Sequence, residues 1–155
     1  MPRMTTRTRK TVTLALAGAL AALPLIGIAA NHENATSDPV KARQELMKEI
    51  GAATKVLGDM AKGARVYDTA AATEAQAALM AAATRIPEAF ETEATDPQSE
   101  ALPAIWSDWP GFTAEARALE TAAANADVSN LDAVRFSLRA IGKACGSCHE
   151  SYRAD

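Results

Sequence analysis

Aromatic residues and glycine are scarce in this chain of 155 residues: aromatic residues make up 5% of it, and there are only 8 glycines. Residues with a branched β-carbon are also sparse, and these are among the residues that favour strands. Alanine dominates the sequence instead, and it has the highest intrinsic helix propensity. The length fits one domain. We therefore expect a single all-α domain.

Cysteine and histidine are rarer still, with two of each, and three of these four residues lie in the motif Cys145-Gly146-Ser147-Cys148-His149. The pattern C-x-x-C-H is typical of c-type haem attachment, in which two thiols add to the vinyl groups and the histidine binds the iron. On a helix, side chains three and four residues apart project from one side. We therefore expect one covalent haem c, with its iron, attached through Cys145 and Cys148 and bound by His149.

Two other kinds of site could use a pair of cysteines. A thioredoxin-type redox pair accompanies a βαβ pattern, which this sequence lacks, and here the pair lies near the C-terminal end of an expected helix. A structural zinc ion needs four ligands, and His32 is the only histidine outside the motif. The motif therefore favours haem over a disulfide or a zinc site.

The first thirty residues have the pattern of an export signal. Four basic residues lie between positions 3 and 10, and residues 11–30 are uncharged, mostly apolar and end in two alanines. We expect a signal peptide over residues 1–30, followed by one haem domain over residues 31–155. An uncleaved membrane anchor is the alternative, because the apolar run is long. Covalent haem and paired thiols belong outside the reducing cytoplasm, so we expect a periplasmic protein.

The charge changes once the signal is removed. Four of the 16 basic residues lie in residues 1–30 and none of the 19 acidic ones do, so the mature chain carries a net charge of about −7. This charge argues against nucleic acid and anionic membrane as partners. No further membrane span is expected after cleavage. An acidic surface permits docking to a basic patch on a redox protein, and a plain solvated surface explains it equally well.

Helix signals and apolar spacing predict four long helices. Asp38 and Pro39 form a start signal, and Gly63 a stop signal. The expected helices cover residues 38–62, 69–86, 109–125 and 130–153, with a helical turn near residues 103–106. Their inward positions are Leu46, Ile50, Ala53, Leu57 and Met60; Leu79, Met80, Ala83 and Ile86; Phe112, Ala116, Leu119 and Ala123; and Leu131, Val134, Leu138, Ile141, Cys145, Cys148 and Tyr152. Short connections then favour an antiparallel four-helix bundle with the covalent haem at one end.

The second axial ligand is less clear from the residues. Methionine sulfur binds haem iron, and the candidates beyond the signal are Met47, Met60 and Met80. If the first and last helices are antiparallel neighbours, Met47 lies near the haem, whereas Met60 lies about 20 Å further along at 1.5 Å per residue. Core filling is the ordinary role of a methionine on an apolar helix. The residues alone therefore favour Met47 but leave this second role open.

Trp106 and Trp109 lie three residues apart in the irregular segment that precedes the third long helix. We expect Trp106 to form part of the wall of the haem pocket. Ordinary core filling is an equally simple role for these two side chains, and the two roles are compatible.

Residues 39–153 resemble the class II cytochromes c, the cytochrome c′ family, which is itself an example of the bundle class expected above. The resemblance is carried by residues 145–153, by Pro103-Ala104-Ile105-Trp106, and by Arg43-Gln44. Leu46-Met47-Lys48, Gly51 and the segment 57–63 are most similar to the low-spin cytochrome c-556 branch; Pro110 departs from the family pattern. The resemblance implies that Met47 is the sixth ligand, that Arg43 lies near the haem edge and that Arg153 lies near the proximal side.

The resemblance also implies a function. A low-spin His/Met haem protein would be a one-electron carrier that exchanges electrons with periplasmic or membrane redox proteins. No catalytic dyad or nucleophile is visible, so we do not expect an enzyme. The alternatives are a five-coordinate, high-spin protein that binds nitric oxide or carbon monoxide, and a haem-bearing structural bundle. The family often forms dimers through its first two helices, so a homodimer is an expected oligomeric state.

Overall fold

The computed structural model describes residues 37–154. They form the helices α1 (Asp38–Ala61), α2 (Thr69–Ala83), α3 (Ile86–Phe90), α4 (Ala104–Ser107), α5 (Trp109–Ala124) and α6 (Leu131–Tyr152). This part of the chain holds no β-strand beyond an isolated bridge between Ala101 and Arg153. None of these helices is long and apolar enough to cross a membrane. The predicted signal peptide, residues 1–30, lies outside the described residues.

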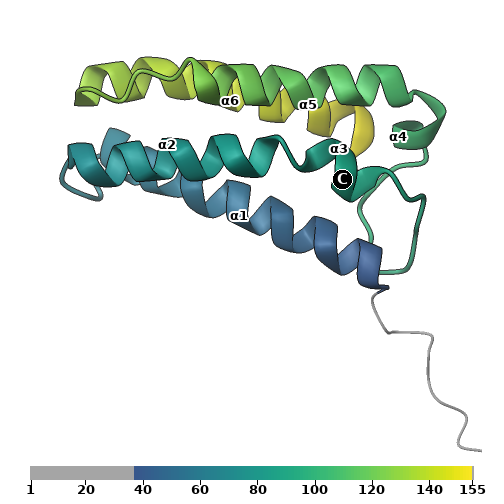
Figure 1. The fold of residues 1–155 in the computed structure, drawn as a ribbon. Helices are drawn as coiled ribbons and strands as arrows, with labels where there is room; N and C mark the ends of the chain where they lie inside the picture. The colour runs from purple at the N-terminus through teal and green to yellow at the C-terminus, as the bar shows by residue number, and fades with distance from the viewer. Residues whose placement is uncertain (1–36, 155) are drawn as a thin grey trace, which may run out of the picture. The chain divides into compact units, whose positions relative to one another are not determined.

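The four long helices, α1, α2, α5 and α6, form an antiparallel bundle (Figure 1). Helix α1 packs against α2 and α6, and α5 packs against the same two helices. At one end of the bundle, Arg135 Nε near the start of α6 donates to the carbonyl of Ala61 at the end of α1, at 3.0 Å. At the same end, the Tyr67 hydroxyl donates to the carbonyl of Val128 at 2.7 Å and joins two loops. The expected all-α four-helix bundle is confirmed.

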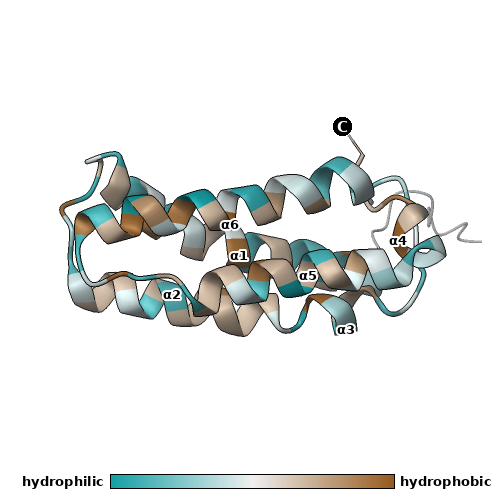
Figure 2. Cartoon of the chain, turned by 90° about the horizontal axis from the view of Figure 1, so that it is seen from above, coloured by the Kyte–Doolittle hydropathy of each residue, from teal (hydrophilic) through white to brown (hydrophobic). Residues whose placement is uncertain are grey.

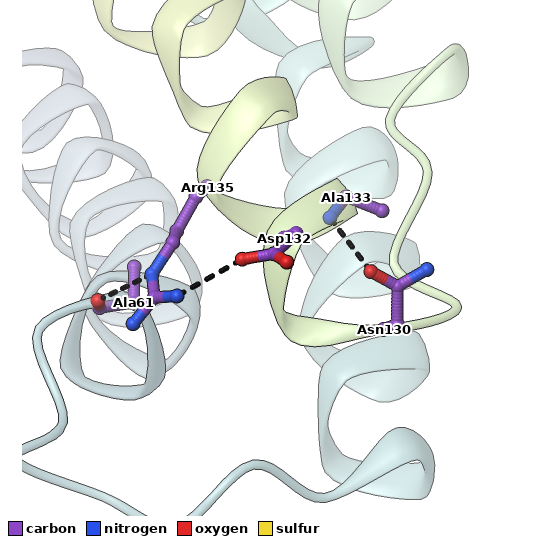
Figure 3. Close-up of polar contacts among 5 residues, drawn as sticks. All are labelled: Ala61, Asn130, Asp132, Ala133 and Arg135. Carbon is purple, nitrogen blue, oxygen red and sulfur yellow. Dashed lines mark hydrogen bonds and ion pairs between the residues drawn. The ribbon is translucent and has the colours of Figure 1, made fainter.

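The helix ends follow capping chemistry, in which a side-chain oxygen accepts from a backbone N–H of the first turn. The acceptors are Asp68 for α2, Asp108 for α5 and Asn130 for α6, at 2.7, 3.2 and 3.0 Å from the nitrogens of Ala71, Gly111 and Ala133. Figure 3 shows the last of these beside the ion pair of Arg135 and Asp132. Helix α1 ends as predicted, because Gly63 just beyond it has a φ of 76°, a conformation that favours glycine.

The second helix ends earlier than predicted. Helix α2 stops at Ala83, and a separate helix, α3, begins at Ile86. Pro87 explains the break, because it has no N–H to donate to the carbonyl of Ala83 and its ring would clash with that carbonyl. In the first turn of α3 the missing N–H costs nothing, since no partner exists for it there. The predicted range 69–86 is therefore wrong at its C-terminal end.

Polar and apolar residues alternate along the long helices, as amphipathic packing requires (Figure 2). Most predicted inward residues are buried, and they form one cluster around Leu46, Ile141 and Phe112 and a second around Leu57 and Met60. The predicted inward position of Met80 is wrong, because its side chain is 41% exposed. The sequence also missed the buried residues Ser137 and Ala144 on α6.

The most deeply buried charge in the described chain is Arg43 of α1, which is only 3% exposed. Its guanidinium donates to the carbonyls of Ala89 at 3.1 Å and Ala94 at 2.8 Å, and to that of Thr92. The guanidinium carbon also lies 5.1 Å from the ring centre of Phe90 and 5.0 Å from that of Trp106. Burial of a charge is costly unless its donors are bonded, and here the bonds tie α3 and the segment after it to α1.

We predict that Arg43→Lys lowers the free energy of unfolding by about 3 kcal/mol, because an ammonium cannot reproduce the fork of bonds and hydrogen bonds to a charged group contribute about 1.5–3 kcal/mol each. Urea denaturation of the haem-loaded protein measures this. The matched control is Gln44→Ala, which removes an exposed 2.8 Å hydrogen bond from the side chain of Gln44 to the carbonyl of Gln98. This change should cost about 1 kcal/mol. Equal losses of unfolding free energy in the two variants would contradict a special stabilising role for the bonds of Arg43.

Candidate haem site

A cleft of about 1010 Å³ is lined by residues of α1, α3, α4, α5 and α6, and by residues 98–101 of the segment between α3 and α4. Ligand pockets in proteins are typically about 300–1,000 Å³, so the cleft has the size of a cofactor site. Met47 on α1 and the motif residues Cys145, Cys148 and His149 on α6 all line it. The antiparallel packing of α1 against α6 therefore brings the predicted attachment residues and the predicted sixth ligand to one cavity.

Cys145 and Cys148 are half-buried free thiols that pack against the core cluster of Leu46 and Phe112. Burial raises the pKa of Cys145. Burial, followed by the charges of Glu115 and Cys145, raises the pKa of Cys148 to about 11. Both shifts report an apolar environment that disfavours thiolates. An apolar cavity with two half-buried thiols on one wall fits a covalently attached macrocycle.

His149 lies at the rim of the cleft, near the C-terminal end of α6. Burial lowers the pKa of its imidazole, the positive charge of Arg153 lowers it further, and Glu100 acts in the opposite direction. The neutral imidazole is the form that binds a metal ion. The surroundings of His149 therefore favour the protonation state that an axial ligand needs.

The three described methionines occupy different environments. Met47 is partly buried and lines the cleft. Met60 is fully buried in the second core cluster, and Met80 is exposed on α2. Neither of these two lines the cleft. Among residues 37–154, Met47 is thus the one methionine that shares a cavity with the motif.

The three other predicted cofactor contacts have different positions. Arg153 lines the cleft, and its Nε donates to Glu100 Oε2 at 2.7 Å. Arg43 also lines the cleft, but its guanidinium is committed to the carbonyls described above. Trp106 is not among the residues that line the cleft and packs against the core cluster of Leu46 and Phe112. Its Nε1 donates to the carbonyl of Phe90 at 2.8 Å, and its ring supports Arg43.

Sequence patterns missed the contacts that hold the end of α6. The Tyr152 hydroxyl donates to Asp108 Oδ2 at 2.8 Å, and the ring packs edge-on against Phe112 with 5.4 Å between centres. The carbonyl of Tyr152 accepts from the N–H of Leu102 at 3.0 Å, and the N–H of Ala154 donates to Glu100 at 2.8 Å. These contacts anchor the helix end three residues beyond His149.

Gly111 is required by the same contact. A Cβ at this position would overlap Asp108 Oδ2 and would lie 2.5 Å from the Tyr152 hydroxyl. Real Cβ atoms essentially never come so close to a neighbour, so any side chain would displace this hydrogen bond. The glycine after Pro110 therefore allows α5 to begin against the end of α6.

Comparison with known proteins agrees with this geometry. The family model described as Cytochrome C′ matches residues 38–153. Cytochrome c-556 of Rhodopseudomonas palustris is 32% identical over 150 residues, covering 91% of this chain and 95% of the relative. Cytochrome c-554 of Cereibacter sphaeroides is 36% identical, covering 90% and 94% of the two chains. A solved nitric oxide complex of the L16A mutant of cytochrome c prime from Alcaligenes xylosoxidans is similar with a TM-score of 0.66 and 27% identity, covering 76% of this chain and 94% of that chain.

The bond to Asp108 and then burial raise the pKa of Tyr152 to about 12, whereas an unfolded tyrosine titrates near pH 10. The pKa of this hydroxyl is therefore higher in the folded protein than in the unfolded chain. Its stabilising contribution is fully present below the pKa of the unfolded chain and is lost as the pH rises from about 10 to 12. We predict that Tyr152→Phe is less stable than the parent protein by a constant amount between pH 7 and 9, and that the gap narrows above pH 10. Denaturation of both proteins at each pH measures this difference in stability. A difference that stays independent of pH up to 12 would contradict the raised pKa of Tyr152.

Proposed function

Because the chain belongs to the cytochrome c′ family of haem proteins, we propose that it is a periplasmic one-electron carrier with one covalent haem c per chain and low-spin iron. The single observation that carries the proposal is that Met47, and neither of the other two described methionines, lines the cleft that contains Cys145, Cys148 and His149. A thioether in that position distinguishes an electron carrier from an open gas-binding site, because it occupies the sixth position of the iron.

Each of the four residues has a separate role in this proposal. Cys145 and Cys148 attach the macrocycle through thioether bonds, and His149 and Met47 supply the two axial ligands. When bound, the haem supplies a one-electron iron couple. The two ligands come from different helices, α1 and α6, whose packing is tied together by the core between them. A site whose ligands are held by packed helices needs little rearrangement when an electron arrives or leaves.

The identity of the relatives supports a carrier. The c-556 and c-554 relatives are named as cytochromes and cover nearly the whole chain. No group of three or more potential metal-binding His, Cys, Asp or Glu side chains occurs in residues 37–154, so the haem iron is the metal centre that we propose. We propose a role in electron exchange rather than in enzymatic turnover, with periplasmic or membrane redox proteins as partners.

A second function is favoured by one observation, the similarity to a cytochrome c prime solved with nitric oxide. In that alternative the iron is five-coordinate, and Met47 is a bulky neighbour of the ligand-binding position instead of a ligand. The protein would then bind nitric oxide or carbon monoxide. The two functions differ in one bond, so they predict different spectra.

We predict that Met47→Ala converts the haem from low-spin to high-spin at neutral pH and allows the reduced protein to bind carbon monoxide readily, because the sixth position loses its thioether. Absorption spectra of the oxidised and reduced protein, with and without carbon monoxide, measure both changes. Met80→Ala is the matched control, because Met80 is exposed and does not line the cleft, and its spectra should equal those of the parent protein. A parent protein that is already high-spin and binds carbon monoxide would refute the carrier and support the alternative.

A further inference from the structure

Phe136 is an unusual residue for the surface of this bundle. It lies on α6 and is 72% exposed, whereas the other two large exposed hydrophobic residues, Val66 and Met80, lie on other elements. Phe136 borders a groove of about 950 Å³ between α5 and α6, separate from the haem cleft. Small side chains line this groove, among them Ala118, Ala122 and Ala140. The groove extends along α6 to Ser147, which lies between the two cysteines of the motif.

The charges around Phe136 are mainly positive. Arg117 of α5 and Lys143 of α6 line the groove, and the guanidinium carbon of Arg139 lies 5.9 Å from the ring centre of Phe136. These four residues, Arg117, Phe136, Arg139 and Lys143, are called the Phe136 patch below. The patch lies on a chain whose residues 31–155 carry a net charge of about −7. Its sign is thus opposite to that of the protein as a whole.

Two acidic residues, Glu115 and Asp127, also line the groove, and Asp132 lies four residues before Phe136 on α6. Asp127 Oδ1 accepts from the N–H of Ser129 at 2.9 Å. Asp132 pairs with Arg135 at 3.0 Å. Glu115 lines both the groove and the haem cleft, and its charge acts on Cys148. The groove and the surface next to Phe136 therefore carry three cations, Arg117, Arg139 and Lys143, against two carboxylates, Glu115 and Asp127, which leaves a net positive charge of one beside the aromatic ring.

We propose that the Phe136 patch docks an acidic face of a protein redox partner. The proposal rests on the function proposed above and names the partner's chemistry. Aromatic residues and arginine carry much of the binding energy at protein interfaces, and complementary charge raises the rate of encounter. A partner seated in the groove reaches Ser147, so it lies against the backbone of the haem-attachment motif.

A second copy of this chain fits the patch less well. A two-fold symmetric contact would place the same surface on both subunits, so Arg117, Arg139 and Lys143 would face the same three cations. Like charges across an interface cost several kcal/mol. An acidic partner instead neutralises them.

The test uses the haem-loaded mature protein, with flavodoxin as the acidic redox probe. Isothermal titration calorimetry at low ionic strength measures binding, and stopped-flow reduction by flavodoxin hydroquinone measures electron transfer. The patch variants are Phe136→Ala and Arg139→Glu. The matched controls are Val66→Ala and Arg65→Glu, since Arg65 and Val66 are exposed residues of the loop between α1 and α2.

We expect each patch variant to weaken flavodoxin binding about tenfold and each control to change it less than twofold. Added salt should weaken the parent protein's binding and narrow the difference for Arg139→Glu, because screening reduces the electrostatic contribution. Oxidation by ferricyanide should be the same for Phe136→Ala and the parent protein, because a small oxidant needs no docked partner.

Several results would overturn the docking proposal. These are equal binding by patch and control variants, a parent dimer that Phe136→Ala dissociates, or sedimentation of the parent protein with anionic phospholipid vesicles that Arg139→Glu abolishes. Failure of the proposed function gives a different result: flavodoxin binds through the patch but transfers no electron, and the reduced protein binds carbon monoxide. The binding measurement therefore decides the docking surface whichever function holds.

Discussion

The antiparallel packing of α1 against α6 is the constraint on which the site depends. Helices α1 and α6 are separated in the sequence by residues 62–130, yet residues of both line the same cleft. Because the helices run in opposite directions, the start of α1 lies beside the end of α6. Met47 and the Cys145–His149 motif therefore meet, whereas Met60 is carried to the far end of the core. Parallel packing of the same helices would have exchanged these two methionines.

Two polar anchors hold the end of the bundle where the cleft opens. Arg43 ties α3 and the irregular segment after it to α1 through three carbonyls. Tyr152 ties the end of α6 to the start of α5 through Asp108. Both sets of contacts lie where short helices and loops meet, so they supply the cohesion that packed long helices supply elsewhere in the bundle. They explain how an apolar cavity of this size stays bordered by fixed elements. Three residues of the Phe136 patch, Phe136, Arg139 and Lys143, lie on the exposed side of α6, whereas the haem-attachment motif lies on the side of α6 that lines the cleft.

Much of the fold could be predicted from the sequence because its signals are local. The start signal at Asp38, the stop signal at Gly63 and the spacing of the apolar residues in α6 each depend on neighbours within one or two turns. The haem site was predictable for the same reason, since two cysteines and a histidine on adjacent turns form a complete attachment motif. The environments of Trp106 and Met80 depend on distant parts of the chain, and the predicted inward position of Met80 was wrong. The indole of Trp106 supports a buried arginine, and the exposure of Met80 depends on which face of an alanine-rich helix has neighbours.

The sequence by itself determined an all-α chain, the positions of most helix ends and a covalent haem motif, because helix propensity, capping and motif spacing act over a few residues. Only the tertiary structure decided which methionine shares a cavity with the motif, because that depends on the direction in which distant helices pack. It also decided that Arg43 bonds loop carbonyls, that Tyr152 meets Asp108, and that Phe136 remains exposed among cations. The bonds of Arg43 and Tyr152 join residues 44 to 51 positions apart, and no local pattern encodes them.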